Sequence, residues 1–180
     1  HSDLMLLIAR TTPKEEVKKR TEGLSVFIVD MREAIGKGLE IKPIRTMINH
    51  ATTEIFFDDL HIPADALVGE EGKGFRYILD GMNAARILIA AECIGDARWF
   101  IQKATDYANE RKVFEREIGK IQGIQFPIAE VYMQTEAADL MVQEAAKKYE
   151  AGEKAGAEAN MAKYLASEAS WKAADMCMQT

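Results

Sequence analysis

The stretch ERKVFEREIGKIQ, residues Glu110–Gln122, joins two long helical patterns and carries an arginine, a phenylalanine and a glutamine that a simple turn does not need. A corner between two helices requires only a residue that ends the first helix and a cap for the second. Taken singly, Arg111 can offset the helix dipole, Phe114 can fill a core and Gln122 can cap a helix. The functional alternative for Arg111 is a bidentate, charge-assisted contact with a phosphate.

Apolar residues recur every three or four positions on both sides of this corner, which is the spacing of an amphipathic helix. The pattern predicts one long helix that ends at about Arg111, a second over about residues 121–149 and a third from near Ala157. The connection AGEKAG, residues 151–156, is short and polar, so the second and third helices should pack antiparallel. Three such helices form most of an up-and-down bundle.

Glycines mark two features of the first helix. The segment GEEGKGF, residues 69–75, is typical of a loop that opens a helix. A phosphate-cradling loop is the alternative, but the glycine spacing matches no nucleotide-binding motif and two acidic residues would repel a phosphate. Gly81 and Gly95 lie inside the helical pattern, where each costs roughly 1 kcal/mol relative to alanine. We therefore expect another element to approach the helix closely at both positions.

The first third of the chain has the pattern of β-strands. Four short apolar or β-branched runs are separated by polar segments, and they are Leu4–Ala9, Leu24–Val29, Leu39–Ile44 and Thr53–Pro63. Their order predicts an antiparallel meander with one buried face. The predicted fold class is therefore α+β, with an antiparallel sheet segment in residues 1–68 and an up-and-down helical bundle in residues 69–180.

Both ends of the chain fall inside such patterns. His1-Ser2-Asp3 leads directly into an apolar strand, and MCMQT stops a helical pattern without a capping glycine. We therefore expect the 180 residues to be part of a longer chain, with both domains incomplete.

Composition excludes several classes of function. Hydrophobic residues make up 48% of the chain, enough for a sizeable core, and the net charge of −6 argues against a general nucleic-acid binder. The longest apolar run, Ile87–Ala91, is too short to span a bilayer. Cys93 and Cys177 lie far apart in helical patterns, so we expect two buried thiols in a reducing compartment rather than a disulfide or a metal site.

Arg86 lies on the apolar stripe of the first helix, one turn after Met82 and one turn before Ile89. An unpaired charge buried there would be very costly, so the guanidinium must meet a partner. The structural alternative is a salt bridge to Glu92 or to an acid on another helix. The functional alternative is contact with a ligand.

The corner closely resembles the acyl-CoA dehydrogenase family, whose second half carries Y-A-x-x-R-x-x-F-G-x-x-I-x-x-x-Q-x-x-Q-x-x-(I/L)-A. The matching residues are Tyr107, Ala108, Arg111, Phe114, Ile118, Gln122, Gln125 and Ala129. Phe57–Phe75 is similar to the strand-to-helix passage of the family, and Arg86 matches its arginine in the helix that follows. Met161–Thr180 is similar to the helix that leads to the family's glycine-rich turn, so the resemblance covers nearly the whole chain.

The resemblance implies an activity and a cofactor. Family members bind FAD between the middle β-domain and the helical bundle, and they oxidise the Cα–Cβ bond of a fatty acyl-CoA thioester to a trans-2-enoyl-CoA. A carboxylate base removes the α-proton, flavin N5 takes the β-hydride, and the electrons pass to electron transfer flavoprotein. The implied protein is a flavin-containing oxidoreductase of fatty acid β-oxidation and a homo-oligomer, dimer or tetramer, in the bacterial cytoplasm or the mitochondrial matrix.

The resemblance also implies the cofactor-binding residues, which are Arg111, Phe114, Ile121, Gln122, Gln179 and Thr180. Arg111 would hold the FAD pyrophosphate, and Phe114 would lie against the flavin nucleotide. Ile121 and Gln122 would line the adenosine side of the cofactor. Gln179 and Thr180 begin the next segment that contacts the cofactor in the family. In the family these residues reach the flavin of a neighbouring subunit, so oligomerisation is part of the site.

The same resemblance places the substrate and shows two departures. Asn83 and Arg86 match positions that touch the CoA-thioester substrate. Ala85 stands where some members carry the catalytic glutamate, and the other common position of the base lies beyond Thr180. No catalytic residue is therefore assigned, and we expect these residues alone to be inactive. Glu115 replaces the glycine that usually follows the motif phenylalanine, which puts a charge at the corner.

Two other functions stay open. An acyl-CoA oxidase on the same scaffold would pass electrons to oxygen, and a non-catalytic helical-bundle module would keep the scaffold for binding or assembly. Arg111, Phe114 and Gln122 argue against the module, because a pure scaffold needs no phosphate clamp. The small residues Ala84, Ala90 and Ala91 fit either a roomy acyl slot or tight helix packing.

Overall fold

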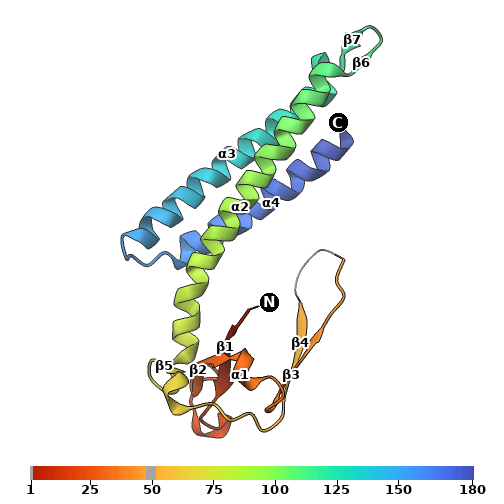
Figure 1. Ribbon diagram of the computed structural model, residues 1–180. Helices are drawn as coiled ribbons and strands as arrows, with labels where there is room; N and C mark the ends of the chain where they lie inside the picture. The colour runs from red at the N-terminus through yellow and green to blue at the C-terminus, as the bar shows by residue number, and fades with distance from the viewer. Residues whose placement is uncertain (1, 48–51) are drawn as a thin grey trace. The chain divides into compact units, whose positions relative to one another are not determined.

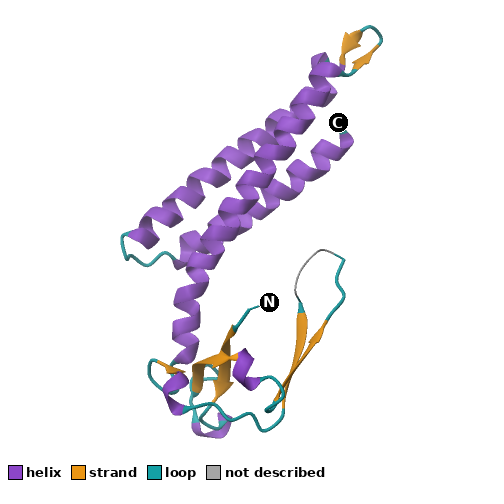
Figure 2. Ribbon diagram, viewed as in Figure 1, coloured by secondary structure: helices purple, strands orange, loops and turns teal. Residues whose placement is uncertain are grey.

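The computed structural model describes residues 2–47 and 52–180, and the chain divides into two compact units between Leu79 and Asp80. The first unit consists mainly of short antiparallel strands and the second of long helices, orange and purple in Figure 2. The predicted α+β class, with a sheet segment followed by an up-and-down bundle, is confirmed. The domain limits 1–68 and 69–180 stay a prediction.

The first sheet contains three strands. β1 (Leu4–Arg10) and β2 (Leu24–Asp30) pair antiparallel along their whole length, as their patterns predict. The loop between them includes a short 3-10 helix, η1 (Lys14–Glu16). β5 (Leu67–Val68) pairs with the other edge of β2, which gives the strand order β1-β2-β5. The core of this unit contains Val29, Ala34 and Leu39.

The second sheet consists of β3 (Leu39–Pro43) and β4 (Thr53–Phe57). The prediction of one four-stranded meander is wrong, because β5 occupies the edge of β2 that β3 would have used. After β2 the chain forms the one-turn helix α1 (Met31–Ala34) and so leaves the first sheet. The fourth strand is also shorter than predicted, and irregular backbone leads from it to the 3-10 helix η2 (Ala64–Ala66).

The glycine-rich segment before the long helix packs on β2. The N–H of Gly72 donates to the hydroxyl of Ser25 at 2.8 Å, and Ser25 is fully buried. A Cβ added to Gly74 would lie 2.7 Å from the backbone of Ser25, so this position requires glycine. Glu70 and Lys73 pair with each other in the same loop. These contacts support the interpretation of GEEGKGF as a helix-opening loop, because its glycines serve packing.

Three long helices follow, α2 (Gly74–Glu110), α3 (Gln122–Glu150) and α4 (Gly156–Gln179). The predicted helix ends near residues 111, 121, 149 and 157 each lie one residue from the observed ends. α3 and α4 pack against each other, and the chain runs up, down and up along the bundle (Figure 1). In the described part of the chain, no helix has the length and apolar character needed to cross a membrane.

Alanine dominates the core of the bundle. One buried cluster contains Ala90, Ile94, Ala138, Val142, Ala145, Ala162, Ala166 and Ala169. Small side chains let helix axes approach closely, so Ala90 serves helix packing, whereas Ala91 is exposed. At the turn between α3 and α4, Lys148 and Glu158 form an ion pair of 2.5 Å.

Gly81 and Gly95 do not mark close contacts. Both are exposed on α2, and apart from the adjacent residues and backbone of α2 itself, no heavy atom of the described residues lies within 4 Å of a Cβ placed on either one. The prediction of close approach is wrong at both positions. The helical period predicts that a glycine at these two positions destabilises the helix, but it does not predict which other element, if any, packs against them.

Candidate functional site

The corner between α2 and α3 is a β-hairpin that extends past the end of α2 (Figure 1). β6 (Lys112–Val113) pairs antiparallel with β7 (Arg116–Glu117) across a two-residue turn. The N–H of Arg111 donates to the carbonyl oxygen of Tyr107 at 2.8 Å, and the carbonyl oxygen of Arg111 accepts from the N–H of Ile118 at 2.9 Å. Arg111 thus belongs both to the last helical turn and to the first pair of the hairpin, which fixes its backbone.

The two residues at the hairpin tip have left-handed backbone conformations, with φ of +54° at Phe114 and +65° at Glu115. A two-residue turn of type I′ requires positive φ at both positions, and Asn or Gly usually fills them. Glu115 therefore keeps the turn but adds strain where the family pattern has glycine. Phe114 is 93% exposed, so its ring faces solvent instead of filling a core.

Replacing Glu115 with glycine should stabilise the hairpin by about 1 kcal/mol, because glycine adopts positive φ without the steric cost. The expected result is roughly fivefold slower hydrogen exchange at the Ile118 N–H, which closes the hairpin on Arg111. Glu115→Ala is the control, since it removes the same charge but keeps the Cβ. Equal slowing in the two variants would show that charge, not backbone strain, is the cause.

Side-chain contacts hold the base of the corner. The amide of Gln125 donates to the carbonyl oxygen of Gly119 at 2.7 Å, and a Cβ on Gly119 would lie 3.0 Å from the carbonyl oxygen of Ala108. Lys120 contacts the Glu117 carboxylate at 2.6 Å and lowers the pKa of Glu117 to about 2, with Lys112 at 3.7 Å as a further partner. The 3-10 helix η3 (Ile118–Lys120) leads from the hairpin into α3. The corner is therefore tied to both helices.

The Arg111 guanidinium has no ion pair or side-chain hydrogen bond with any described residue, and the side chain is exposed. Its neighbour Lys112 pairs with Glu117 instead. The backbone of Arg111 is fixed, and no carboxylate of the described residues pairs with its guanidinium. Such a guanidinium is suited to bind an anion through two parallel hydrogen bonds.

The last two residues of the chain lie at the same end of the bundle as the hairpin (Figure 1). Gln179 and Thr180 line one hollow of about 470 Å³ with Tyr107, which is one turn before Arg111. They line a second hollow of about 310 Å³ with Gly123, the residue after Gln122. Gln179 is exposed, and the Thr180 hydroxyl donates to the carbonyl oxygen of Met176 at 2.9 Å. The fold thus brings the predicted cofactor residues from three segments to one end of the bundle.

A mainly apolar groove of about 410 Å³ lies between α2 and the start of α3. Its lining includes Ile101, Thr105, Ala108, Asn109, Gly119, Ile124, Gln125, Ile128, Ala129 and Tyr132. Ile121 and Gln122 come shortly before the α3 residues that line this groove. Ile121 is half-buried, and Gln122, the first residue of α3, is exposed. Sequence reasoning missed Asn109 and Tyr132, because neither belongs to the matched motif. Tyr107 does belong to it, but the motif gives it no role.

Asn83 and Arg86 lie far from this corner. The Arg86 guanidinium donates to the amide oxygen of Asn83 at 3.0 Å, and it has no carboxylate partner among the described residues. The salt-bridge alternative for Arg86 is therefore wrong within the described chain, and its charge is not neutralised by Asn83. Along the same helix, the 25 residues from Arg86 to Arg111 correspond to about 37 Å. One small ligand cannot touch both arginines of a single chain.

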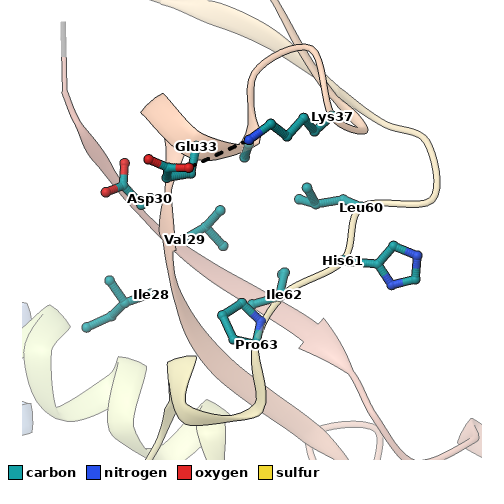
Figure 3. A pocket seen from close by; sticks show the side chains of 10 residues that line it. Ile28, Val29, Asp30, Glu33, Lys37, Leu60, His61, Ile62 and Pro63 are labelled. Atoms are coloured by element: carbon teal, nitrogen blue, oxygen red, sulfur yellow. Dashed lines mark ion pairs between the residues drawn. The ribbon is translucent and has the colours of Figure 1, made fainter.

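A separate hollow of about 440 Å³ lies in the first unit (Figure 3). Val29, Leu60, Ile62 and Pro63 give it an apolar lining, and the ion pair between Glu33 and Lys37, 3.6 Å, lies at its edge. None of the predicted cofactor or substrate residues lines this hollow, so it does not belong to the candidate site.

Comparison with known proteins identifies the family. The model of the acyl-CoA dehydrogenase C-terminal domain matches residues 72–180. The chain is 43% identical over 129 residues to the acyl-CoA dehydrogenase FadE12 of Mycobacterium tuberculosis, covering 71% of this chain and 33% of the relative. It is 36% identical over 156 residues to the caffeyl-CoA reductase-Etf complex subunit CarC of Acetobacterium woodii, covering 86% and 41%. It is 33% identical over 180 residues to the mitochondrial long-chain specific acyl-CoA dehydrogenase of Rattus norvegicus, covering 99% and 41%.

Two solved structures show the same fold. A structure of PigA with FAD and proline aligns with a TM-score of 0.90 at 26% identity, covering 99% of this chain and 45% of that one. A glutaryl-coenzyme A dehydrogenase in complex with glutaryl-CoA aligns with a TM-score of 0.83 at 29% identity, covering 99% and 44%. The chain spans less than half the length of these proteins. The corner motif, the strand-then-bundle fold and the family match over residues 72–180 lead to one conclusion: the chain belongs to the acyl-CoA dehydrogenase family.

Proposed function

We propose that the protein containing this chain is an FAD-dependent acyl-CoA dehydrogenase that converts acyl-CoA thioesters to trans-2-enoyl-CoA and passes electrons to electron transfer flavoprotein. The observation that carries this proposal is the corner at Arg111. An exposed guanidinium, without a carboxylate partner among the described residues, stands at a fixed backbone position in register with the family motif. A helix corner that served only to turn the chain would not need it.

The residues at this end of the bundle fit a flavin dinucleotide. Arg111 would bind the diphosphate through charge-assisted hydrogen bonds, and the exposed ring of Phe114 would supply an aromatic surface. Ile121 and Gln122 would line the adenosine side. Gln179 and Thr180 would add contacts from the end of α4, as the shared hollows suggest. When bound, FAD would supply the acceptor for the hydride of the substrate.

Two sites on one helix favour a homo-oligomer, a dimer or a tetramer. Asn83 and Arg86 would contact the CoA-thioester substrate, and the bond between them would hold the guanidinium in place. Because Arg111 directly follows the end of α2, about 37 Å from Arg86, it would serve the flavin of a neighbouring subunit. Each chain would then contribute to two active sites.

The catalytic base is not assigned to any residue of this chain. Ala85 has no acid–base group, so the proton would be taken by a residue outside positions 1–180. We propose residues 1–68 as part of the middle β-domain and residues 69–180 as part of the helical domain. Relatives from bacteria and from mitochondria support a location in the bacterial cytoplasm or the mitochondrial matrix.

The test is anaerobic reduction of the purified protein by acyl-CoA thioesters of several chain lengths. We expect stoichiometric FAD and loss of its visible absorbance with at least one thioester. Reoxidation by electron transfer flavoprotein, but not rapidly by oxygen, would separate a dehydrogenase from an oxidase. Protein that binds no flavin, or whose flavin no acyl-CoA reduces, would contradict the proposal and favour a non-catalytic module.

A further inference from the structure

We propose that Arg116 is a second cofactor-binding residue, which acts with Arg111 as a two-guanidinium clamp on a nucleoside diphosphate group. The inference rests on the proposed function, because it concerns the same cofactor. It goes beyond the residues that the family motif identifies, and it starts from the pairing of the β6–β7 hairpin.

The register of the hairpin points to both arginines lying on one face. Val113 is opposite Arg116 in the pairing register, and the carbonyl oxygen of Arg111 accepts from the N–H of Ile118. Arg111 directly precedes β6 and Ile118 directly follows β7. Side chains alternate between the faces of a strand, and by continuing this alternation one residue beyond β6 we infer that Arg111 shares a face with Val113 and its partner Arg116. Arg111 and Arg116 are therefore diagonal neighbours, roughly 7–8 Å apart along the ladder.

On the other face of the hairpin, the charged side chains are paired with each other. Lys112 is opposite Glu117, and Glu117 is paired with Lys112 at 3.7 Å and Lys120 at 2.6 Å. In contrast, neither Arg111 nor Arg116 forms an ion pair or a side-chain hydrogen bond with any residue in the ranges 2–47 and 52–180. Two like charges thus remain close together with no anion from these ranges between them, and an anionic ligand would relieve their repulsion.

A diphosphate matches this arrangement better than a single phosphate. Each guanidinium offers a planar fork of donors that suits one phosphate group, and the two phosphates of a diphosphate are linked side by side.

The experiment compares Arg116→Gln with Lys112→Gln in the purified flavin-free protein. Each variant removes one positive charge close to the hairpin tip, Arg116 one residue from it and Lys112 two residues from it. The two side chains lie on opposite faces of the hairpin. Dissociation constants are measured by calorimetry for FAD and ADP, which carry a diphosphate, and for FMN and AMP, which carry a monophosphate. Circular dichroism checks the fold, which should persist because both side chains are exposed.

We expect Arg116→Gln to weaken FAD and ADP by about 10- to 100-fold, with a smaller loss for FMN and AMP. Lys112→Gln should change all four only about twofold, as a screened surface charge does. Arg116→Lys should recover part of the loss, because it restores the charge but not the fork. Equal effects of Arg116→Gln and Lys112→Gln, or equal losses for the two ligand classes, would overturn the inference.

Arg111→Gln separates this failure from a failure of the proposed function. If Arg111→Gln releases FAD while Arg116→Gln behaves like Lys112→Gln, the cofactor proposal stands and only the second arginine is wrong. If Arg111→Gln leaves FAD binding unchanged, the two-arginine clamp is wrong although the protein binds FAD. If the unaltered protein binds no FAD, both proposals are wrong.

Discussion

Replacing Arg111 with alanine is expected to release most of the flavin from the purified protein while the helical bundle stays folded. The guanidinium is exposed and makes no ion pair or side-chain hydrogen bond in the described chain, so its loss should cost the fold little. If it binds the diphosphate, removal of the charge-assisted hydrogen bonds should weaken FAD by about 10- to 100-fold. The measurements are the flavin-to-protein ratio after gel filtration and the dissociation constant of FAD.

Arg98→Ala is the matched control for this experiment. Arg98 is also an arginine of α2, but its guanidinium contacts Glu136 and Asp139, each at 3.0 Å. This exposed pairing contributes little to stability, and it is not part of the candidate site. The control should retain its flavin. A full complement of flavin in Arg111→Ala would show that the Arg111 guanidinium does not hold the diphosphate, and it would remove the main structural support for the proposed cofactor site.

Replacing Gly38 with alanine is expected to destabilise the first unit by about 2–5 kcal/mol. Gly38 has φ of +99°, which an L-residue adopts at a cost of roughly 1–2 kcal/mol. A Cβ there would also lie 2.6 Å from the carbonyl oxygen of Asp58 and 2.8 Å from the Cα of Leu60. Since these are backbone atoms, the clash can be relieved only by moving the chain between β4 and η2. Urea unfolding followed by far-ultraviolet circular dichroism gives the free energy.

Gly36→Ala isolates the steric part of that cost. Gly36 precedes Gly38 by two residues and has φ of +78°, but apart from its two chain neighbours no described residue has a heavy atom within 4 Å of a Cβ placed on it. The variant should lose only the cost of positive φ, about 1–2 kcal/mol. If both alanine variants unfold at the same urea concentration, the close approach of Asp58 and Leu60 to residue 38 does not contribute to the free energy of unfolding.

The sequence alone determined the helices and the corner between them. The ends of α2, α3 and α4 lie where the three-to-four-residue period stops, because that period depends on neighbours within a few residues. The positions of Arg111, Phe114 and Gln122 at a helix junction follow from the same local pattern. Their spacing also pointed to the correct family. The short polar link between α3 and α4 was enough to predict antiparallel packing.

Only the tertiary structure decided which segments became neighbours. The strand runs were found, but β2 pairs with the distant β5 instead of β3, and no local pattern encodes a choice between two partners for one edge. Gly81 and Gly95 lack close neighbours in the described chain, and Arg86 binds Asn83 instead of an acid, since both outcomes depend on what other helices present. Arg116 is opposite Val113 only because of the β6–β7 register, which the local sequence pattern does not give. Local periodicity describes one element at a time, whereas pairing and burial are set by competition between elements far apart in the chain.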